Sequence, residues 1–172
     1  MTLADVLAAL AGLAIAGAGF ASISVILSLF VPNAVERAGA RIANRLARSL
    51  GLGLLLFLGV LILAGSLLKV PFPLARLAAI GAILGGFSLA VLGGAAMAAT
   101  LARRSRASVE APVGLRDLLR GVFLLETAVL LPIVGWFVVL PAAFLISLGA
   151  GFHAVLRRGV PAATAAAPVP QG

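Results

Sequence analysis

Apolar residues fill five long runs of the chain, and short segments with proline, glycine and arginine separate these runs. Uninterrupted apolar runs of about 18 residues or more are typical of helices that span a membrane. The pattern predicts apolar helices over residues 3–31, 50–68, 77–101, 118–131 and 135–156. We therefore expect an all-α fold, a polytopic transmembrane helical bundle with about five apolar helices, in a single membrane domain over residues 1–158.

Prolines mark the ends of the first two runs. The pair Pro32–Asn33 follows the first run, and the segment Lys69–Pro73 follows the second. Both places predict breaks, because proline disfavours helical backbone in the residue before it. The fourth run, 118–131, is shorter than the ~20 residues that a span needs, so we expect a short or re-entrant helix there. The expected architecture is one long N-terminal span followed by two helical hairpins.

Arginine dominates the two longer segments between the runs. In residues 34–49 it recurs at spacings of four, four and three, which places these side chains on one face of a helix. We expect an amphipathic helix in the headgroup region, with an ordinary basic loop as the alternative. Residues 102–119 combine further arginines with proline and glycine, which predicts a basic loop. The candidate contacts to lipid or a partner are Arg37, Arg41, Arg45, Arg48, Arg103, Arg104 and Arg106.

The net charge of +8 arises from 13 basic and 5 acidic residues. In a soluble protein this excess would indicate nucleic acid, but here the arginines flank apolar runs, as in membrane proteins that set their orientation by charge. The expected partners are the anionic headgroups of the bilayer and a protein partner or a homo-oligomer, and no nucleic acid. Because basic loops stay on the cytoplasmic side, we expect the N-terminus outside and the basic loops and the C-terminus inside.

Composition and the chain ends add to this picture. Lysine is nearly absent while alanine and glycine abound, which is typical of GC-rich bacterial genomes, so we expect a multi-pass protein of the bacterial cytoplasmic (inner) membrane. No basic residue precedes the first apolar run, unlike in a cleavable secretory signal, and we expect this run to be retained. Residues 159–172 contain three prolines and no periodicity, which predicts a disordered C-terminal tail.

Two ionisable residues lie within the fourth and fifth runs. Glu126 lies six residues after Arg120, and His153 lies four residues before Arg157, so the two reach a comparable depth. Such residues usually face the interior of a bundle and pair or protonate, because a charge at this depth is costly. A pair that titrates or binds a polar ligand is one interpretation. A buried hydrogen bond that only joins two helices is the other.

The chain offers little for catalysis. It has no cysteine, one histidine and 5 acidic residues, and it contains no nucleophile-elbow, His-Glu-x-x-His or phosphate-loop motif. We therefore expect no enzymatic activity, no metal site and no cofactor.

Small residues recur at spacings of four along the third run. Gly81 and Gly85 form one such pair, and a series that begins at Gly86 continues through Gly94. Small residues at this spacing let helix backbones approach closely in lipid. Packing within one chain and a homo-oligomer interface both fit the pattern.

The last two runs also carry a family resemblance. The stretches are Gly-Val-Phe-Leu-Leu at 121–125, Leu-Pro-Ile-Val-Gly-Trp at 131–136 and Leu-Gly-Ala-Gly at 148–151. Over residues 34–158 the chain resembles the multi-span membrane module found behind bactofilin-type polymer-forming domains of bacteria and archaea. The turn at 69–73 departs from the Gly-x-Pro element usual in that family, and the chain has no polymer-forming β domain. The resemblance implies a membrane anchor or organiser whose partner is a separate chain.

These observations favour a non-enzymatic integral membrane scaffold, anchor or accessory subunit with an arginine-rich cytoplasmic face. The alternative is a small transporter or channel with Glu126 and His153 near the path.

Overall fold

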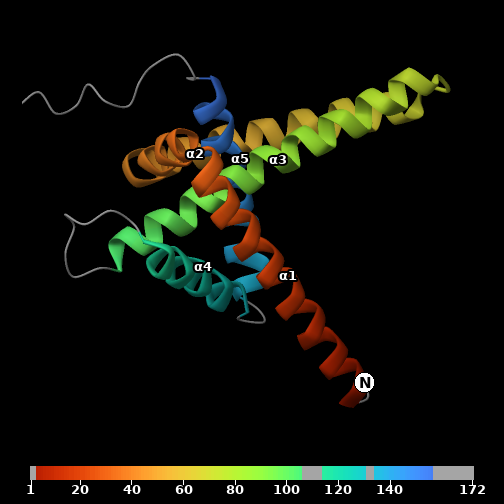
Figure 1. Ribbon diagram of the computed structural model, residues 1–172. Helices are drawn as coiled ribbons and strands as arrows, with labels where there is room; N and C mark the ends of the chain where they lie inside the picture. The colour runs from red at the N-terminus through yellow and green to blue at the C-terminus, as the bar shows by residue number, and fades with distance from the viewer. Residues whose placement is uncertain (1–2, 106–113, 131–133, 157–172) are drawn as a thin grey trace, which may run out of the picture.

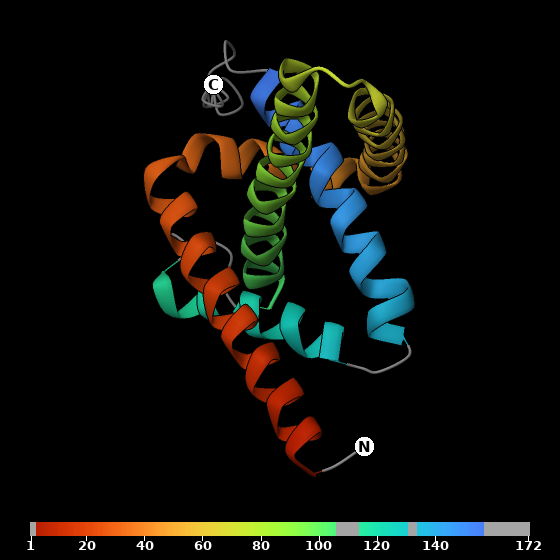
Figure 2. The ribbon, with the colours of Figure 1, turned by 90° about the vertical axis from the view of Figure 1, so that its right-hand side faces the viewer.

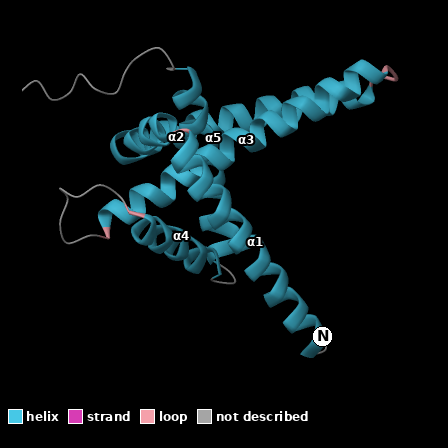
Figure 3. Ribbon diagram, viewed as in Figure 1, coloured by secondary structure: helices cyan, strands magenta, loops and turns pink. Residues whose placement is uncertain are grey.

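The computed structural model describes residues 3–105, 114–130 and 134–156 (Figure 1). Its elements are α1 (Leu3–Phe30), α2 (Pro32–Lys69), α3 (Pro73–Arg104), α4 (Leu115–Leu130), the π-helical segment η1 (Gly135–Val139) and α5 (Leu140–Leu156). No strand occurs in these ranges (Figure 3). The predicted all-α architecture with about five helices is confirmed. The predicted tail, residues 159–172, lies outside the described residues.

Prolines determine where the first three helices meet. The single residue Val31 joins α1 to α2, and Pro32 is the first residue of α2. Val70 and Phe72 each precede a proline and have extended backbone, with ψ angles of 124° and 125°. A following proline disfavours the helical region of the preceding residue, which explains both conformations. The breaks therefore lie where the sequence predicts them.

The predicted amphipathic segment 34–49 and the apolar run 50–68 both lie in α2, which consists of two helices joined at a kink. Only Arg45 leaves the helical region, with φ −145° and ψ 50°. The two halves of α2 run in different directions from this kink (Figure 2). No proline occurs after Pro32 until the end of α2, so nothing in the sequence forces a break between the two segments.

The predicted basic loop 102–119 is also shorter than expected. Helix α3 continues through Arg104, and α4 begins at Leu115. Arginine is a good helix former, so two arginines extend α3 instead of ending it. The loop is thus confined to residues 105–114, of which residues 106–113 lie outside the described ranges.

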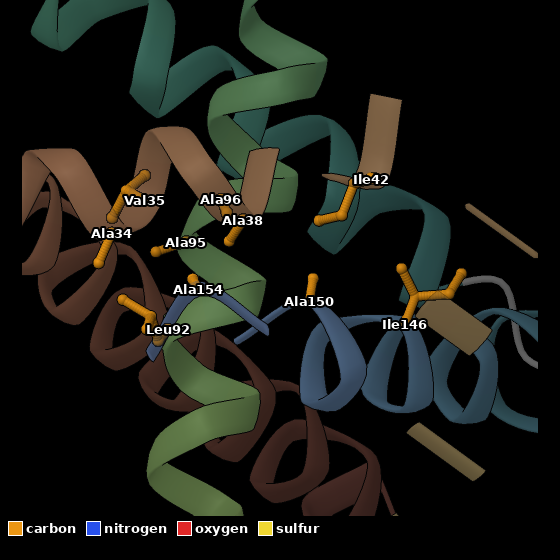
Figure 4. Close-up of a cluster of buried hydrophobic side chains, with 10 residues drawn as sticks. All are labelled: Ala34, Val35, Ala38, Ile42, Leu92, Ala95, Ala96, Ile146, Ala150 and Ala154. Atoms are coloured by element: carbon orange, nitrogen blue, oxygen red, sulfur yellow. The ribbon is translucent and has the colours of Figure 1, made fainter. Parts of the chain in front are cut away.

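The core lies where α2, α3 and α5 cross (Figure 4). Its buried residues are mostly alanines: Ala34, Val35, Ala38, Ile42, Leu92, Ala95, Ala96, Ile146, Ala150 and Ala154. The first four belong to the basic segment, so the apolar face of this segment packs against helices. This face is therefore covered by protein, and the expected location of residues 34–49 in the headgroup region stays a prediction, because amphipathicity shows that one face is apolar but not what covers it.

Glycines bring α5 into backbone contact with both neighbouring helices. A Cβ atom on Gly149 would lie 2.8 Å from Gly53 N in α2. A Cβ atom on Gly151 would lie 3.4 Å from Gly93 N in α3 and would collide with a carbonyl oxygen of that helix. In lipid no hydrophobic force draws helices together, so close packing of this kind has to hold the crossing.

Two local features shape the last helices. Gly114 N–H donates a hydrogen bond of 3.2 Å to Asp117 Oδ2, which satisfies a free donor at the start of α4. In η1, Leu140 N–H donates to Gly135 O, five residues back. Pro141 has no N–H, and its ring crowds the carbonyl group four residues earlier in a regular α-helix. The π-helical turn directly before Pro141 is wider than an α-helical turn and relieves this crowding.

Within the described ranges, three helices are long and apolar enough to cross a membrane: α2, α3 and the continuous helix Gly135–Leu156. The hairpin of α2 and α3 projects from the rest of the molecule, at the upper right of Figure 1. Its exposed large apolar residues include Leu55, Ile62, Leu74, Leu77 and Phe87. An apolar surface of this extent would be a liability in water and suits contact with lipid.

Candidate functional site

The structure brings the two basic segments together. A Cβ atom on Gly39 in α2 would lie 3.1 Å from Thr100 Oγ1 in α3, so the helices touch beside the arginines. Arg103 Nη2 lies 3.5 Å from Glu36 Oε1, and both side chains are about half exposed. A surface ion pair of this kind contributes at most ~1 kcal/mol, so it aligns the segments without holding them together.

We call this surface the arginine face and define it by Arg37, Arg41, Arg45, Arg48, Arg103 and Arg104. Arg106, the seventh predicted residue, lies outside the described residues. Arg45 and Arg48 are exposed, as are Arg103 and Arg104 at the end of α3. Most of this face therefore presents mobile positive charge to whatever adjoins it.

Arg37 differs from these exposed residues. It is partly buried, and its Nε atom is shielded from solvent and has no hydrogen-bond partner among the described residues. The guanidinium carries five N–H donors in a fixed fork and stays charged. A shielded guanidinium nitrogen without an acceptor is costly, and the Nε atom of Arg41 is shielded from solvent in the same way.

Glu126 faces α1 in the structure. A Cβ atom on Gly17 would lie 2.9 Å from Glu126 Oε2 and 3.1 Å from Oε1, so the missing side chain of Gly17 leaves room for the carboxyl group. Glu126 Oε1 is shielded and has no hydrogen-bond partner in the described part of the chain. The sequence places Glu126 at depth, but only the fold reveals its contact with α1.

His153 occupies the last turn of α5, in the helix that packs against α2 and α3. Helix α4, with Glu126, packs instead against α3, α1 and η1. The contact found for the Glu126 carboxyl group is with Gly17, and the pairing of Glu126 with His153 stays a prediction.

The four predicted packing glycines divide into two groups. Gly94 packs against Phe20 in α1, whose Cε2 atom would lie 2.9 Å from an added Cβ, and Gly86 is in ordinary contact with Val60. Gly81 and Gly85 have open space where a side chain would be, so they make no packing contact within the chain, and the homo-oligomer alternative stays a prediction for them. They lie on the projecting hairpin, beyond the crossing, where no third helix reaches.

The glycines that matter most for packing were not predicted as such. They are Gly53, Gly93, Gly149 and Gly151, at the crossing of α5 with α2 and α3. The signal was present in the Leu-Gly-Ala-Gly stretch at 148–151, since two glycines two residues apart project to different sides of a helix. A search for small residues at spacings of four finds helices that pack through one face. It misses a helix such as α5, which packs against a neighbour on each of two sides.

Within the described residues, no group of three or more histidine, aspartate or glutamate side chains could hold a metal ion. The fold and the exposed apolar hairpin define a helical membrane protein with a basic face. Comparison with models of protein families, with curated proteins and with solved structures gives no match.

Proposed function

We propose that the protein is a non-enzymatic scaffold, anchor or accessory subunit of the bacterial cytoplasmic membrane, and that its arginine face contacts an acidic partner or anionic lipid. The observation that carries this proposal is the meeting of two basic segments, joined by an ion pair between Glu36 and Arg103, 67 positions apart in sequence. The N-terminus would lie outside and the arginine face in the cytoplasm, in keeping with the positive-inside bias.

The resemblance to the bactofilin-associated membrane module adds a candidate partner. The resemblance implies that a polymer-forming protein in a separate chain would dock on the arginine face. The contact would be electrostatic, so it would give specificity and a rapid encounter and would weaken with salt.

The test is affinity purification of the tagged protein in mild detergent, with bound proteins and lipids identified by mass spectrometry. Replacing the exposed pair Arg45 and Arg48 by glutamine should weaken binding of the partner by about thirtyfold, since each of the two charges near an anionic surface is worth ~1 kcal/mol. The matched control replaces Lys69 and Arg76, an exposed basic pair at the far end of the hairpin. Equal losses in both variants would refute a dedicated basic face.

A second candidate function rests on Glu126, whose Oε1 atom is shielded without a donor. A small transporter or channel would use this carboxyl group, together with His153, along its path. This function predicts pH-dependent flux in proteoliposomes that Glu126→Gln abolishes. The scaffold function predicts no flux in either protein.

A further inference from the structure

Helix α4 is too short to cross a membrane. Its 16 residues rise about 24 Å, less than the hydrocarbon core of about 30 Å. It is not among the three candidate spans of the described ranges. One side of the helix, with Leu118, Val122 and Leu125, is buried against neighbouring helices, so the surroundings of its other side determine how α4 lies.

The exposed side of α4 carries an apolar strip next to a basic one. Leu115, Leu119 and Phe123 recur at spacings of four, with 60%, 45% and 68% of their surface accessible. Arg116 and Arg120 each follow one of these leucines directly and are also exposed. Water is unfavourable for the apolar strip and the hydrocarbon core for the arginines, whereas the membrane interface accommodates both.

The two acidic residues of α4 have contacts of their own. Asp117 Oδ2 accepts the hydrogen bond from Gly114 N–H at the start of the helix. The Glu126 carboxyl group lies against Gly17 of α1. Both carboxyl groups therefore meet protein atoms, and the two arginines set the charge of the exposed side, which favours an anionic surface.

The contact with α3 places α4 at the end of a candidate span. A Cβ atom on Gly121 would collide with Ala98 O and would lie 2.9 Å from Ala102 N. Arg103 and Arg104 follow directly and end the apolar run of α3, as basic residues do where a spanning helix leaves the hydrocarbon. Figure 2 shows α4 lying across this end of α3. A helix in this position runs along the membrane surface.

We infer that α4 lies in the plane of the membrane, with Leu119 and Phe123 in the acyl region and with Arg116 and Arg120 on the phosphate groups of anionic lipids. An anionic lipid fits this surface better than an acidic protein, because its acyl chains cover the leucines and the phenylalanine beside the arginines. Neither arginine belongs to the arginine face, so the inference does not depend on the proposed function. It makes the fourth apolar helix a short surface helix instead of a re-entrant one.

The experiment measures depth along α4. The chain has no cysteine, so Leu115→Cys, Leu119→Cys and Phe123→Cys can each carry a single nitroxide label in vesicles of phosphatidylglycerol and phosphatidylcholine. The accessibility of each label to oxygen and to a polar nickel complex gives its depth. The three labels should lie at one depth, about 5–10 Å below the headgroups, whereas a helix entering the membrane would place Phe123 about 12 Å deeper than Leu115.

Exposed positions of α3 provide the matched control. Labels at Leu77→Cys and Leu84→Cys should differ in depth by about 10 Å, because seven residues of a spanning helix separate them. Equal depths there would overturn the inference, since α3 would then not be the span that α4 meets.

A second measurement identifies the lipid. A fluorophore at Leu119→Cys is quenched by phosphatidylglycerol or by phosphatidylcholine, whichever of the two carries a nitroxide on its acyl chain. Phosphatidylglycerol should be enriched beside α4 by about fivefold or more, and the double variant Arg116→Gln and Arg120→Gln should abolish the enrichment. The same fluorophore at Leu84→Cys should show no preference, because no basic residue lies within seven positions of it.

Three other results would overturn the inference. A steady increase in depth from Leu115 to Phe123 would indicate a re-entrant or spanning helix. Labels inaccessible to both oxygen and the nickel complex would show that a protein covers this side. Equal quenching by the two lipids at Leu119 would remove the role of the arginines.

Discussion

Substitution of Gly149 by alanine tests the crossing of α2 and α5. The added Cβ atom would collide with Ser49 O, and it would lie 2.8 Å from Gly53 N and 3.0 Å from the Ser49 carbonyl carbon. All three are backbone atoms of α2, which cannot rotate away as the end of a side chain can. The two helices would have to separate along their contact, at the centre of the core.

The expected cost follows from this geometry. Overpacking a well-packed interior by one methyl group typically costs about 1–3 kcal/mol. For a chain of this size each kcal/mol shifts the melting temperature by about 2–4 °C. Gly149→Ala should therefore lower the melting temperature by several degrees. At most exposed helix positions, by contrast, replacing glycine by alanine stabilises the helix by up to about 1 kcal/mol.

The assay is thermal unfolding in detergent followed by circular dichroism, with Gly81→Ala as the matched control. Gly81 has open space where the methyl group would go, so this variant should melt at the same temperature as the unmodified protein or higher. If Gly149→Ala were as stable as Gly81→Ala, the backbone contact between α2 and α5 would be refuted, and with it the position of the core.

Two further predictions use the same unfolding assay, and a third uses amide hydrogen exchange. Gly17→Ala should lower the melting temperature less than Gly149→Ala does, because it crowds only the flexible end of Glu126. The loss should vanish in a Glu126→Ala background, and a loss that persists there would exclude the contact. Ser49→Ala removes a fully buried hydroxyl that has no hydrogen-bond partner in the described part of the chain, so it should leave stability unchanged or raise it. Clear destabilisation would reveal a partner for that hydroxyl. Asp117→Ala removes the acceptor for Gly114 N–H and should destabilise α4 by about 0.5–2 kcal/mol, seen as faster amide exchange confined to α4; unchanged exchange would contradict the cap.

The breaks between helices and the helical class follow from local chemistry. Pro32, Pro71 and Pro73 restrict the backbone before them wherever they occur, so the ends of α1 and α2 could be read directly. The kink at Arg45 could not, because no proline or glycine lies there and arginine favours helix. A bend of this kind depends on how the two halves of α2 pack against α3 and α5.

The candidate sites could also be predicted only where they depend on local sequence. The spacing of the arginines in 34–49 predicts one basic helical face, and the structure has a helix there that breaks at Arg45, so Arg48 lies beyond the kink. The difference between exposed Arg48 and partly buried Arg37 has no counterpart in the spacing, since burial depends on neighbouring helices. The contact of Glu126 with Gly17 joins residues more than 100 positions apart, and local periodicity carries no information about such pairs.

The order of residues along the chain was enough to predict that it is all-helical, that several of its helices are apolar enough for a membrane, and that its arginines concentrate in two segments. These properties depend on side-chain hydrophobicity and backbone restriction, which act over a few residues. The packed helices were needed to show that the two segments meet, that the apolar face of the basic segment is part of the core, and that Gly149 and Gly151 let α5 pack between two helices. Those features depend on which helix faces which, and in a chain so rich in small apolar residues many faces look alike until the helices are packed.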